Sequence, residues 1–392
     1  MRVLHVIPAI AARYGGPSSA VLGLTRALAE SGVETLIATT DADGGERLPL
    51  PLGEITEYEG AFVIAFRRVA TESFKYTPGL SAWLNREVAN FDVVHIHGVM
   101  SHSSLAASWA ARASNVPYVL RPLGALDDVS LGHHPRRKQA FLRLWGRSMV
   151  KDAAVVHCTG PEEFATVRDR YAGSHPVLLP LGIDDRLFTS GSRREVQPPY
   201  VLCMSRLAER KGIEDLVDAF GAVAGEGTFA HWRLVLAGSG NPAFVARLAE
   251  RAGASQAADR IELPGWVAGA AKQEWLSGAA VFALPSLHEN FGLSVLEAMA
   301  CGAPVIIRRE VQIAHWVALA DAGWITDGES GSLEAALREA MSKETERERR
   351  GTAARDVAMG FRWPVIAEHV KALYQQVIRP RSRSPVAAAS VS

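Results

Sequence analysis

SLHENFGLSVLEAMACGAPVII, residues 286–307, has the pattern of a loop, a helix and a buried strand. The apolar run 279–284 before it predicts another strand, closed by Pro285, which lacks the N–H that a strand interior needs. The helix is expected to begin near Leu293 and to end at Gly302, a residue suited to the left-handed position after a helix. Because loops that follow parallel strands open onto ligand sites, and helix N-termini attract anions, this loop is expected to face a ligand. Its central residues are Glu289, Asn290, Phe291 and Gly292.

Two carboxylates, Glu289 and Glu297, stand in this stretch. Ser294 with Glu297 three residues later fits a capping box, whereas no local pattern demands a carboxylate at Glu289. Eight helical residues span roughly 12 Å, more than the roughly 5 to 9.5 Å between the carboxyl groups of a glycosidase. This disfavours a hydrolase that uses the two as acid and base, although part of the segment is loop.

The run from Glu289 to Leu293, then Glu297 to Gly302 and Pro304 to Ile306, resembles the E-x7-E signature of retaining glycosyltransferases with the GT-B fold, family 4. The resemblance implies an α/β protein with two Rossmann-like domains facing across a cleft. It also implies that Glu289 lies beside the donor sugar and that Glu297 holds the ribose hydroxyls. The backbone from Asn290 to Leu293 would meet the sugar and phosphates.

Length and composition set outer limits on the class of protein. At 392 residues the chain exceeds the size at which single cores usually stop growing, so two domains are expected. The 42 basic and 42 acidic residues cancel, which disfavours nucleic acid as a partner and makes any anion site local. The three scattered cysteines argue against a zinc cluster and for a reducing, cytoplasmic compartment. The first ten residues are interpreted as a strand, not a signal peptide, and no apolar run approaches the roughly 18 residues of a membrane span.

Apolar runs alternate with helical patterns over the first 180 residues, which predicts a doubly wound sheet. Strands are expected at 3–8, 35–40, 61–67, 93–97, 118–121, 153–157 and 177–180, and a loop at 41–60.

Gly15 and Gly16 precede a helix expected at 17–30. Glycines let a backbone approach a ligand closely, and the resemblance places a Gly-Gly loop at the donor phosphate and acceptor, although a plain strand-helix turn is the alternative. The pattern is not G-x-G-x-x-G, which disfavours a nicotinamide cofactor.

His95 and His97 alternate on one expected strand and so point the same way. With His102 they suggest a metal site, but no carboxylate or thiolate clusters with them, so we predict no metal. A catalytic role for His97 at the end of the strand competes with the interpretation that it is a buried, satisfied histidine.

Arg121 ends the next expected strand, and Asp127 follows a short loop. Many members of the resembling family have a sugar-binding histidine where Leu123 stands. We therefore expect Arg121 or Asp127 to take over part of that contact.

Residues 133–151 combine six cations with apolar residues at helical spacing, the pattern of a basic amphipathic helix. We favour a helix that packs its apolar stripe on its own sheet over one that meets anionic lipid or a phosphorylated lipid acceptor. In either case Arg136, Arg137 and Lys138 form a local anion patch.

Arg206 and Lys211 follow the strand expected at 200–204 and precede a helix. Two cations at a helix N-terminus suit a diphosphate, and the alternative is a solvated charged loop. The resembling family has the same Arg and Lys-Gly spacing, which favours the first. In that family the loops of Gly238 and of Trp266 and Val267 flank the nucleotide. Residues 308–312 (RREVQ) replace the family's small Gly-Gly loop.

The predicted domains are an acceptor-side domain of residues 1–183, joined by a crossing helix at 363–378, and a donor domain of residues 198–362. The tail 379–392 is expected to be disordered.

The resemblance implies a metal-independent, retaining hexosyltransferase with no cofactor beyond its nucleotide-sugar donor. Its partners would be that donor and a glycan or lipid-linked acceptor for polysaccharide or cell-envelope synthesis. It would work in the cytoplasm, with peripheral contact at the inner face of the membrane. A GT-B epimerase or hydrolase acting on a nucleotide sugar, or a non-catalytic sugar-nucleotide-binding subunit, is the alternative.

Overall fold

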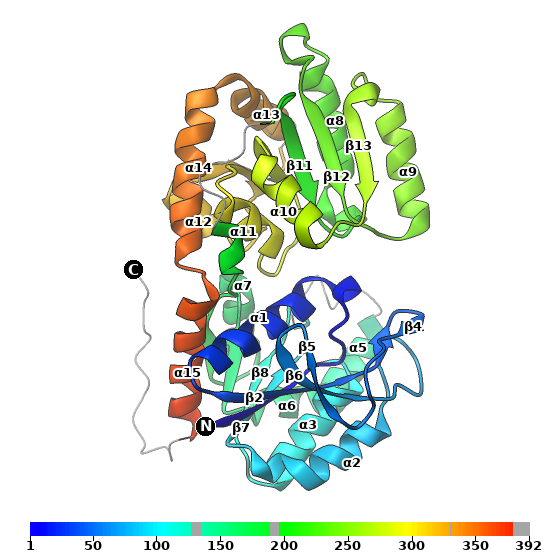
Figure 1. Cartoon of the computed structure of the whole chain (residues 1–392), viewed down its shortest axis with the longest axis vertical. Helices are drawn as coiled ribbons and strands as arrows, with labels where there is room; N and C mark the ends of the chain where they lie inside the picture. Colours follow the sequence, from blue (N-terminus) through cyan, green and yellow to red (C-terminus); the bar gives the residue numbers. More distant parts are fainter. Residues whose placement is uncertain (127–134, 189–195, 330, 379–392) are drawn as a thin grey trace. The chain divides into compact units, whose positions relative to one another are not determined.

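The computed structural model describes residues 1–126, 135–188, 196–329 and 331–378, and the chain divides into two compact units (Figure 1). Unit 1 comprises Met1–Leu179 and the segment from Pro364 onward, whereas unit 2 comprises Pro180–Trp363. Unit 2 is therefore an insertion in the sequence of unit 1. The tail from residue 379 lies outside the described residues.

Unit 1 contains an eight-stranded sheet in the order β10-β9-β8-β7-β1-β2-β6-β5, parallel except for β5. Its strands are β1 (Arg2–Val6), β2 (Glu34–Thr40), β5 (Ile55–Tyr58), β6 (Ala61–Phe66), β7 (Val93–His97), β8 (Tyr118–Arg121), β9 (Val155–Cys158) and β10 (Pro176–Leu178). Its helices are α1 (Gly16–Glu30), α2 (Pro78–Glu87), α3 (His102–Ala113), α5 (Pro135–Phe141), α6 (Arg147–Lys151), α7 (Pro161–Arg170) and α15 (Trp363–Ile378). Two 3-10 turns, η1 (Ala12–Tyr14) and η2 (Val88–Asn90), and a π-helical segment, η3 (Leu142–Gly146), complete the unit. The predicted doubly wound sheet is confirmed.

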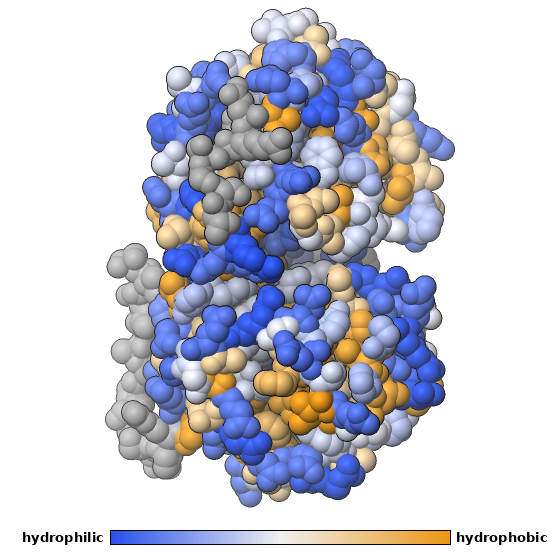
Figure 2. All heavy atoms as spheres, in the orientation of Figure 1, coloured by the Kyte–Doolittle hydropathy of each residue, from blue (hydrophilic) through white to orange (hydrophobic). Residues whose placement is uncertain are grey.

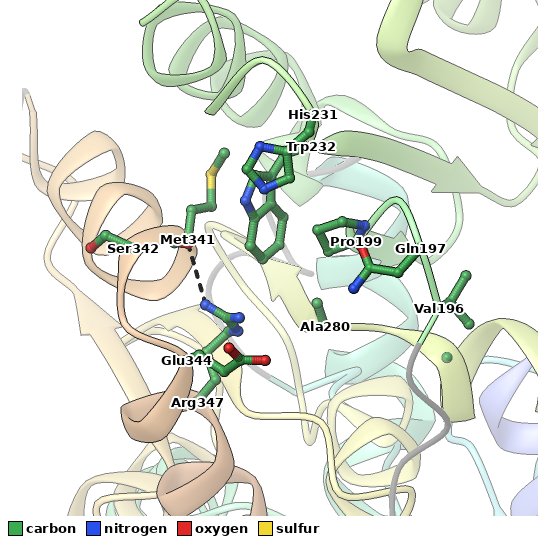
Figure 3. A pocket seen from close by; sticks show the side chains of 11 residues that line it. Val196, Gln197, Pro199, His231, Trp232, Ala280, Met341, Ser342, Glu344 and Arg347 are labelled. Carbon is green, nitrogen blue, oxygen red and sulfur yellow. Dashed lines mark hydrogen bonds between the residues drawn. The ribbon is translucent and has the colours of Figure 1, made fainter. Parts of the chain in front are cut away.

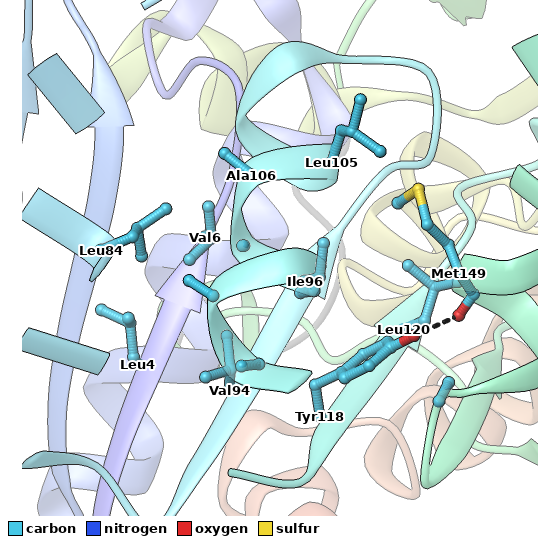
Figure 4. Close-up of a cluster of buried hydrophobic side chains, with 14 of the residues drawn as sticks. Leu4, Val6, Leu84, Val94, Ile96, Leu105, Ala106, Tyr118, Leu120 and Met149 are labelled. Carbon is cyan, nitrogen blue, oxygen red and sulfur yellow. Dashed lines mark hydrogen bonds between the residues drawn. The ribbon is translucent and has the colours of Figure 1, made fainter. Parts of the chain in front are cut away.

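The two faces of this sheet differ in chemistry because side chains alternate along each strand. Leu4 and Val6 of β1 and Val94 and Ile96 of β7 pack against α2, α3 and α6 in an apolar core (Figure 4). Burying a side chain of this kind stabilises the fold by about 1.5 to 3 kcal/mol. The residues between them, among them His5, point to the opposite face, where α1 and α15 pack.

The loop predicted at 41–60 is wrong in part. Residues Ala42–Asp43 (β3) and Glu46–Arg47 (β4) form a small hairpin, and β5 pairs antiparallel with β6. The turn between β5 and β6 has Glu59 at φ 51° and Gly60 at φ 74°, the left-handed pair typical of a two-residue hairpin. In the short edge strand β5 no residue is fully buried, so its sequence does not alternate clearly between apolar and polar residues, and it was not predicted as a strand. Exposed Ile55 and Phe62 belong to this hairpin.

Unit 2 contains a six-stranded parallel sheet in the order β13-β12-β11-β14-β15-β16. Its strands are β11 (Tyr200–Met204), β12 (Arg233–Ala237), β13 (Ile261–Gly265), β14 (Val281–Leu284), β15 (Val305–Arg308) and β16 (Gly323–Thr326). Its helices are α8 (Ile213–Ala224), α9 (Pro242–Gly253), α10 (Gly269–Gly278), α11 (Leu293–Ala300), α12 (Ala314–Leu319), α13 (Ser332–Ser342) and α14 (Glu344–Met359), with turns η4 (Asp185–Phe188), η5 (Glu209–Lys211), η6 (Gly227–Phe229) and η7 (Ala258–Arg260). Both units are thus Rossmann-like, and on the face in Figure 2 hydrophilic and hydrophobic residues intersperse in each.

Candidate functional site

The loop and helix after β14 form the centre of the candidate site. Gly292 occupies the position before α11 with φ 96°, and no side chain caps the helix. A Cβ on Gly292 would lie 2.9 Å from Cγ1 of Val311, so a larger residue meets both strain and crowding. The first N–H groups of α11 have no partner within the helix, as at any helix N-terminus, and suit an anion.

The predicted capping box of Ser294 and Glu297 is wrong, because the helix begins two residues too early for Ser294 to be its cap. Glu297 instead accepts a hydrogen bond from Lys272 of α10, with Nζ and Oε1 2.6 Å apart. The sequence analysis did not single out Lys272, since α10 and α11 approach only in the folded chain.

Glu289 forms an ion pair with Lys211, whose ammonium is held by carboxylate oxygen Oε2. Lys211 is buried, and its side chain lies in the turn η5 after β11. The following Gly212 has φ 64°, and a Cβ there would lie 2.1 Å from the carbonyl oxygen of Pro285. The backbone of the β11 turn therefore packs directly on the end of β14 and brings the two charges together.

Arg206 also follows β11, but it is exposed and has no ion pair with any residue of the described ranges. Gly238, after β12, packs so closely on this loop that a Cβ would lie 1.9 Å from the carbonyl oxygen of Ser205. After β13 come Trp266, half exposed at 51%, and the partly buried Val267. The carboxyl ends of β11 to β14 thus gather the predicted donor-binding residues of unit 2 at one edge of its sheet.

The pocket in Figure 3 lies at the opposite edge of the unit 2 sheet, where the strands begin. It has a volume of about 220 Å³ and is lined by residues that precede β11, β12 and β14, such as Pro199, Trp232 and Ala280. It holds none of the predicted site residues.

In unit 1, Gly15 has φ 70° and joins η1 to α1, which begins at Gly16 with Pro17 in its first turn. A Cβ on Gly15 would meet no atom within 4 Å, so its backbone conformation, and not crowding, demands glycine there.

His97 belongs to a buried histidine cluster, which we define as His5, His95, His97 and His157. The carbonyl oxygen of Leu179 can only accept, so neutral His157 donates through Nε2 (2.9 Å) and accepts at Nδ1 from Nε2 of His95 (3.3 Å). Nδ1 of His95 then accepts from the Tyr374 hydroxyl (2.6 Å). His5 and His97 bond to each other at 3.0 Å.

His5, His95 and His97 each place a ring nitrogen within 4.8 Å of the others, whereas the metal interpretation had grouped His95 and His97 with His102. His102 lies elsewhere and bonds to the Thr77 N–H. Both ring nitrogens of His95 take part in hydrogen bonds, and the adjacent guanidinium of Arg121 opposes a cation. The absence of a metal therefore stays a prediction.

Arg121 is not exposed, so it is not placed to make the contact to the donor sugar that the sequence analysis expected of it or of Asp127. It pairs in register with His97, and its side chain is fully buried beside the histidine cluster. Its guanidinium nitrogens have no hydrogen-bond partner among the described residues, and burial lowers its pKa to about 10. Asp127 lies outside the described residues.

The loop after β8 is held by Glu163, a residue that the sequence analysis missed. Leu123 and Gly124 have φ 61° and 72°, and the Gly124 N–H donates to the buried carboxylate of Glu163 at 2.6 Å. Glu163 sits in the first turn of α7 and also accepts from the Thr159 N–H. No local pattern reveals its contact with Gly124, which lies on another loop.

The basic segment forms α5, η3 and α6, and the prediction that it packs on its own sheet is confirmed. Leu142, Met149 and Val150 are buried in the core. Arg136 and Arg137 are exposed and Lys138 is half-buried, and Leu144 and Trp145 of η3 are exposed as well. A surface that is both basic and apolar remains after packing.

Residues 186–357 match the family "Glycosyl transferases group 1", and residues 15–182 match "Glycosyl transferase 4-like domain". The chain is 28% identical over 400 residues to a phosphatidyl-myo-inositol mannosyltransferase of Propionibacterium freudenreichii, covering 95% of this chain and 94% of that one. It is 25% identical over 391 residues to a D-inositol 3-phosphate glycosyltransferase of Corynebacterium diphtheriae, covering 92% and 89%.

Among solved structures, a sucrose-phosphate synthase of Thermosynechococcus elongatus has a TM-score of 0.77 at 21% identity, covering 96% of this chain and 98% of that one. An Anabaena protein in complex with UDP and glucose has a TM-score of 0.76 at 17% identity, covering 96% and 100%. These structures share the fold of this chain.

The histidine cluster predicts a loss of stability in mild acid. Burial lowers the pKa of His5 and His157 to about 3 and also lowers the pKa of His95 and His97, and Arg121 adds to each shift. A histidine in the unfolded chain has a pKa near 6.5. Below that pH the unfolded chain therefore binds protons that the folded chain does not bind. Stability should be complete above about pH 6.5 and should fall by up to about 1.4 kcal/mol per histidine and pH unit.

Urea unfolding of unit 1 at pH 7.5, 6.5 and 5.5, followed by tyrosine and tryptophan fluorescence, measures this slope. His157→Gln, whose amide can both donate to Leu179 and accept from His95, should reduce the slope by about one proton. An unfolding midpoint that does not change between pH 7.5 and 5.5 would contradict the assignment.

Proposed function

We propose, on the premise that the chain belongs to the group 1 glycosyltransferases with a GT-B fold, that it moves a hexose from a nucleoside-diphosphate sugar to a glycan or lipid-linked acceptor. Transfer would retain the anomeric configuration and need no metal. The observation that carries this proposal is the edge of the unit 2 sheet, where Arg206, the Lys211–Glu289 pair and the N-terminus of α11 meet.

Three groups at this edge suit the departing diphosphate. Arg206 offers a planar fork of donors, Lys211 a point charge, and α11 its unpaired N–H groups. Such fixed positive groups stabilise the charge that develops on the leaving phosphate, the part that a metal plays elsewhere. An ammonium has three donors, so Lys211 can bind a phosphate oxygen while it holds Glu289.

Glu289 would face the sugar. In the described residues its charge is balanced by Lys211, which fixes the position of the carboxylate. A carboxylate so placed would stabilise the oxocarbenium-like charge of glycosyl transfer. Phe291 is buried, so it would offer the donor its backbone and not its ring.

The rest of the donor would extend along the same edge. Trp266 exposes half of its indole, a surface on which a nucleobase can stack, and Val267 adjoins it. Asn290, Gly292 and Leu293 would line the sugar and phosphates, Gly238 would border the nucleotide, and Glu297 would bind the ribose.

The acceptor would bind to unit 1 beside the loop of Gly15 and Gly16, whereas His97 is fully buried and would not touch it. The relatives in Propionibacterium and Corynebacterium are named for phosphatidyl-myo-inositol and inositol 3-phosphate, so we propose an anionic, lipid-linked acceptor or a glycan. None of the helices among the described residues combines the length and the apolar composition of a membrane span. We propose a cytoplasmic enzyme that reaches the inner face of the membrane through the basic surface of α5 to α6.

The reaction itself can be tested with radiolabelled UDP- and GDP-sugars and lipid or glycan acceptors. Transfer should persist in excess EDTA, and ¹H NMR of the product should show the anomeric configuration of the donor. Activity that EDTA abolishes and a divalent metal restores would contradict the proposal. Equal consumption of donor with and without acceptor would instead identify a hydrolase or an epimerase.

Glu289→Gln should lower kcat by about 10² to 10³-fold, the usual effect of removing one group that stabilises transition-state charge. Donor KM should change little, because glutamine keeps the shape of the side chain. Glu297→Gln is the matched variant, and it should mainly raise donor KM. Steady-state kinetics decides the roles, and a kcat loss confined to Glu297→Gln would reverse them.

Vesicle sedimentation tests the membrane contact. The chain should bind weakly to vesicles that contain anionic lipid, since each cation near the surface contributes about 1 kcal/mol. High salt should release it, because salt screens this attraction. Replacing Arg136, Arg137 and Arg143 with glutamine should abolish binding. The control replaces Arg251 and Arg338, exposed arginines of unit 2 that are engaged in ion pairs. Equal binding to neutral vesicles would refute the contact.

A further inference from the structure

The ion pair between Lys272 and Glu297 is a second charged pair at the candidate donor edge. Its ammonium and carboxylate are 2.6 Å apart, and the side chains are 32% and 13% exposed. Lys272 meets only Oε1, and Oε2 has no hydrogen bond to any residue of the described ranges. The pair therefore presents a free acceptor beside an ammonium that retains two of its three donors.

The position of Lys272 has no evident structural purpose of its own. It lies in the first turn of α10, where the helix dipole disfavours a cation. The neighbouring Arg355 does not hold Glu297, because its guanidinium bonds to the carbonyl oxygens of Ala300 and Phe188. Lys272 is thus the cation that fixes the Glu297 carboxylate.

We propose that Lys272 and Glu297 together form a subsite for the ribose diol of the donor. A hydroxyl is both donor and acceptor, and the pair offers one partner for each function at adjacent positions. One ribose hydroxyl donates to Oε2 of Glu297 while a free N–H of Lys272 donates to the oxygen of a ribose hydroxyl. The inference rests on the proposed function, which places the ribose at Glu297, and it adds Lys272 as the residue that makes the subsite selective.

The expected selectivity is modest for a physical reason. A site that rejects a deoxy analogue by 10⁴-fold or more does so because its polar groups are left buried and unpaired. Here Lys272 and Glu297 stay paired with each other when the hydroxyls are missing. The preference for a ribonucleotide over its 2′,3′-dideoxy counterpart should therefore be about tenfold, the worth of one or two net hydrogen bonds.

Isothermal calorimetry with UDP, GDP and their 2′,3′-dideoxy counterparts tests the subsite. Lys272→Met should lower the affinity for the preferred ribonucleotide about tenfold and that for its dideoxy form less than threefold. The ratio of the two affinities should therefore fall toward one. Lys272→Arg should keep most of the ratio, since it preserves a cation with several donors. Arg206→Ala should weaken both nucleotides alike, because it acts on the phosphates.

Lys343→Met is the control, as Lys343 forms the same kind of ion pair with Glu339 on α13. It should leave both affinities unchanged, and thermal unfolding verifies that each variant is folded. A wild-type protein that binds none of the four nucleotides would refute the proposed function. If the wild type binds but Lys272→Met keeps its ratio, or loses both affinities equally, only the ribose subsite is refuted.

Discussion

The partly buried ion pair between Lys211 and Glu289 is the interaction on which the organisation of the unit 2 site depends. It joins the turn after β11 to the loop after β14, two adjacent strands of the sheet. Lys211 is the more deeply enclosed partner, so the loss of Glu289 would leave its ammonium largely buried without an opposite charge. The close approach of Gly212 to Pro285 sets the two backbones before the side chains meet. The adjacency of β11 and β14, the close packing at Gly212 and the attraction of the two charges thus all fix the position of the same loop.

Local patterns were enough to predict most regular elements. The strands Val93–His97, Tyr118–Arg121 and Tyr200–Met204 begin and end where the sequence places them, because buried parallel strands are short apolar runs with sharp boundaries. The helix after Glu289 and the Arg206 to Lys211 turn were likewise evident. The first residue of α11 was not predicted correctly. Its N-cap is Gly292, because the left-handed conformation of that residue starts the helix before Ser294.

Contacts between distant segments could not be predicted. Lys272 meets Glu297 across two helices, and Glu163 holds Gly124 from 39 positions away. His95 and Tyr374 are 279 positions apart, so no spacing rule reveals the histidine cluster or the burial of Arg121 within it. Because arginine is usually exposed, the sequence suggested that Arg121 could reach a ligand. The register of β8 instead directs its side chain into the protein beside His97.

The insertion of unit 2 within unit 1 has a consequence for synthesis on the ribosome. Unit 2 is continuous, and its two ends meet where Ile183 exchanges backbone hydrogen bonds with Phe361 and Trp363. It can therefore close before the rest of the chain has emerged. Unit 1 lacks its last helix until residue 374 has been made, and Tyr374 is what completes the hydrogen bonds of His95. The half of the protein that is translated first is thus the half that finishes folding last.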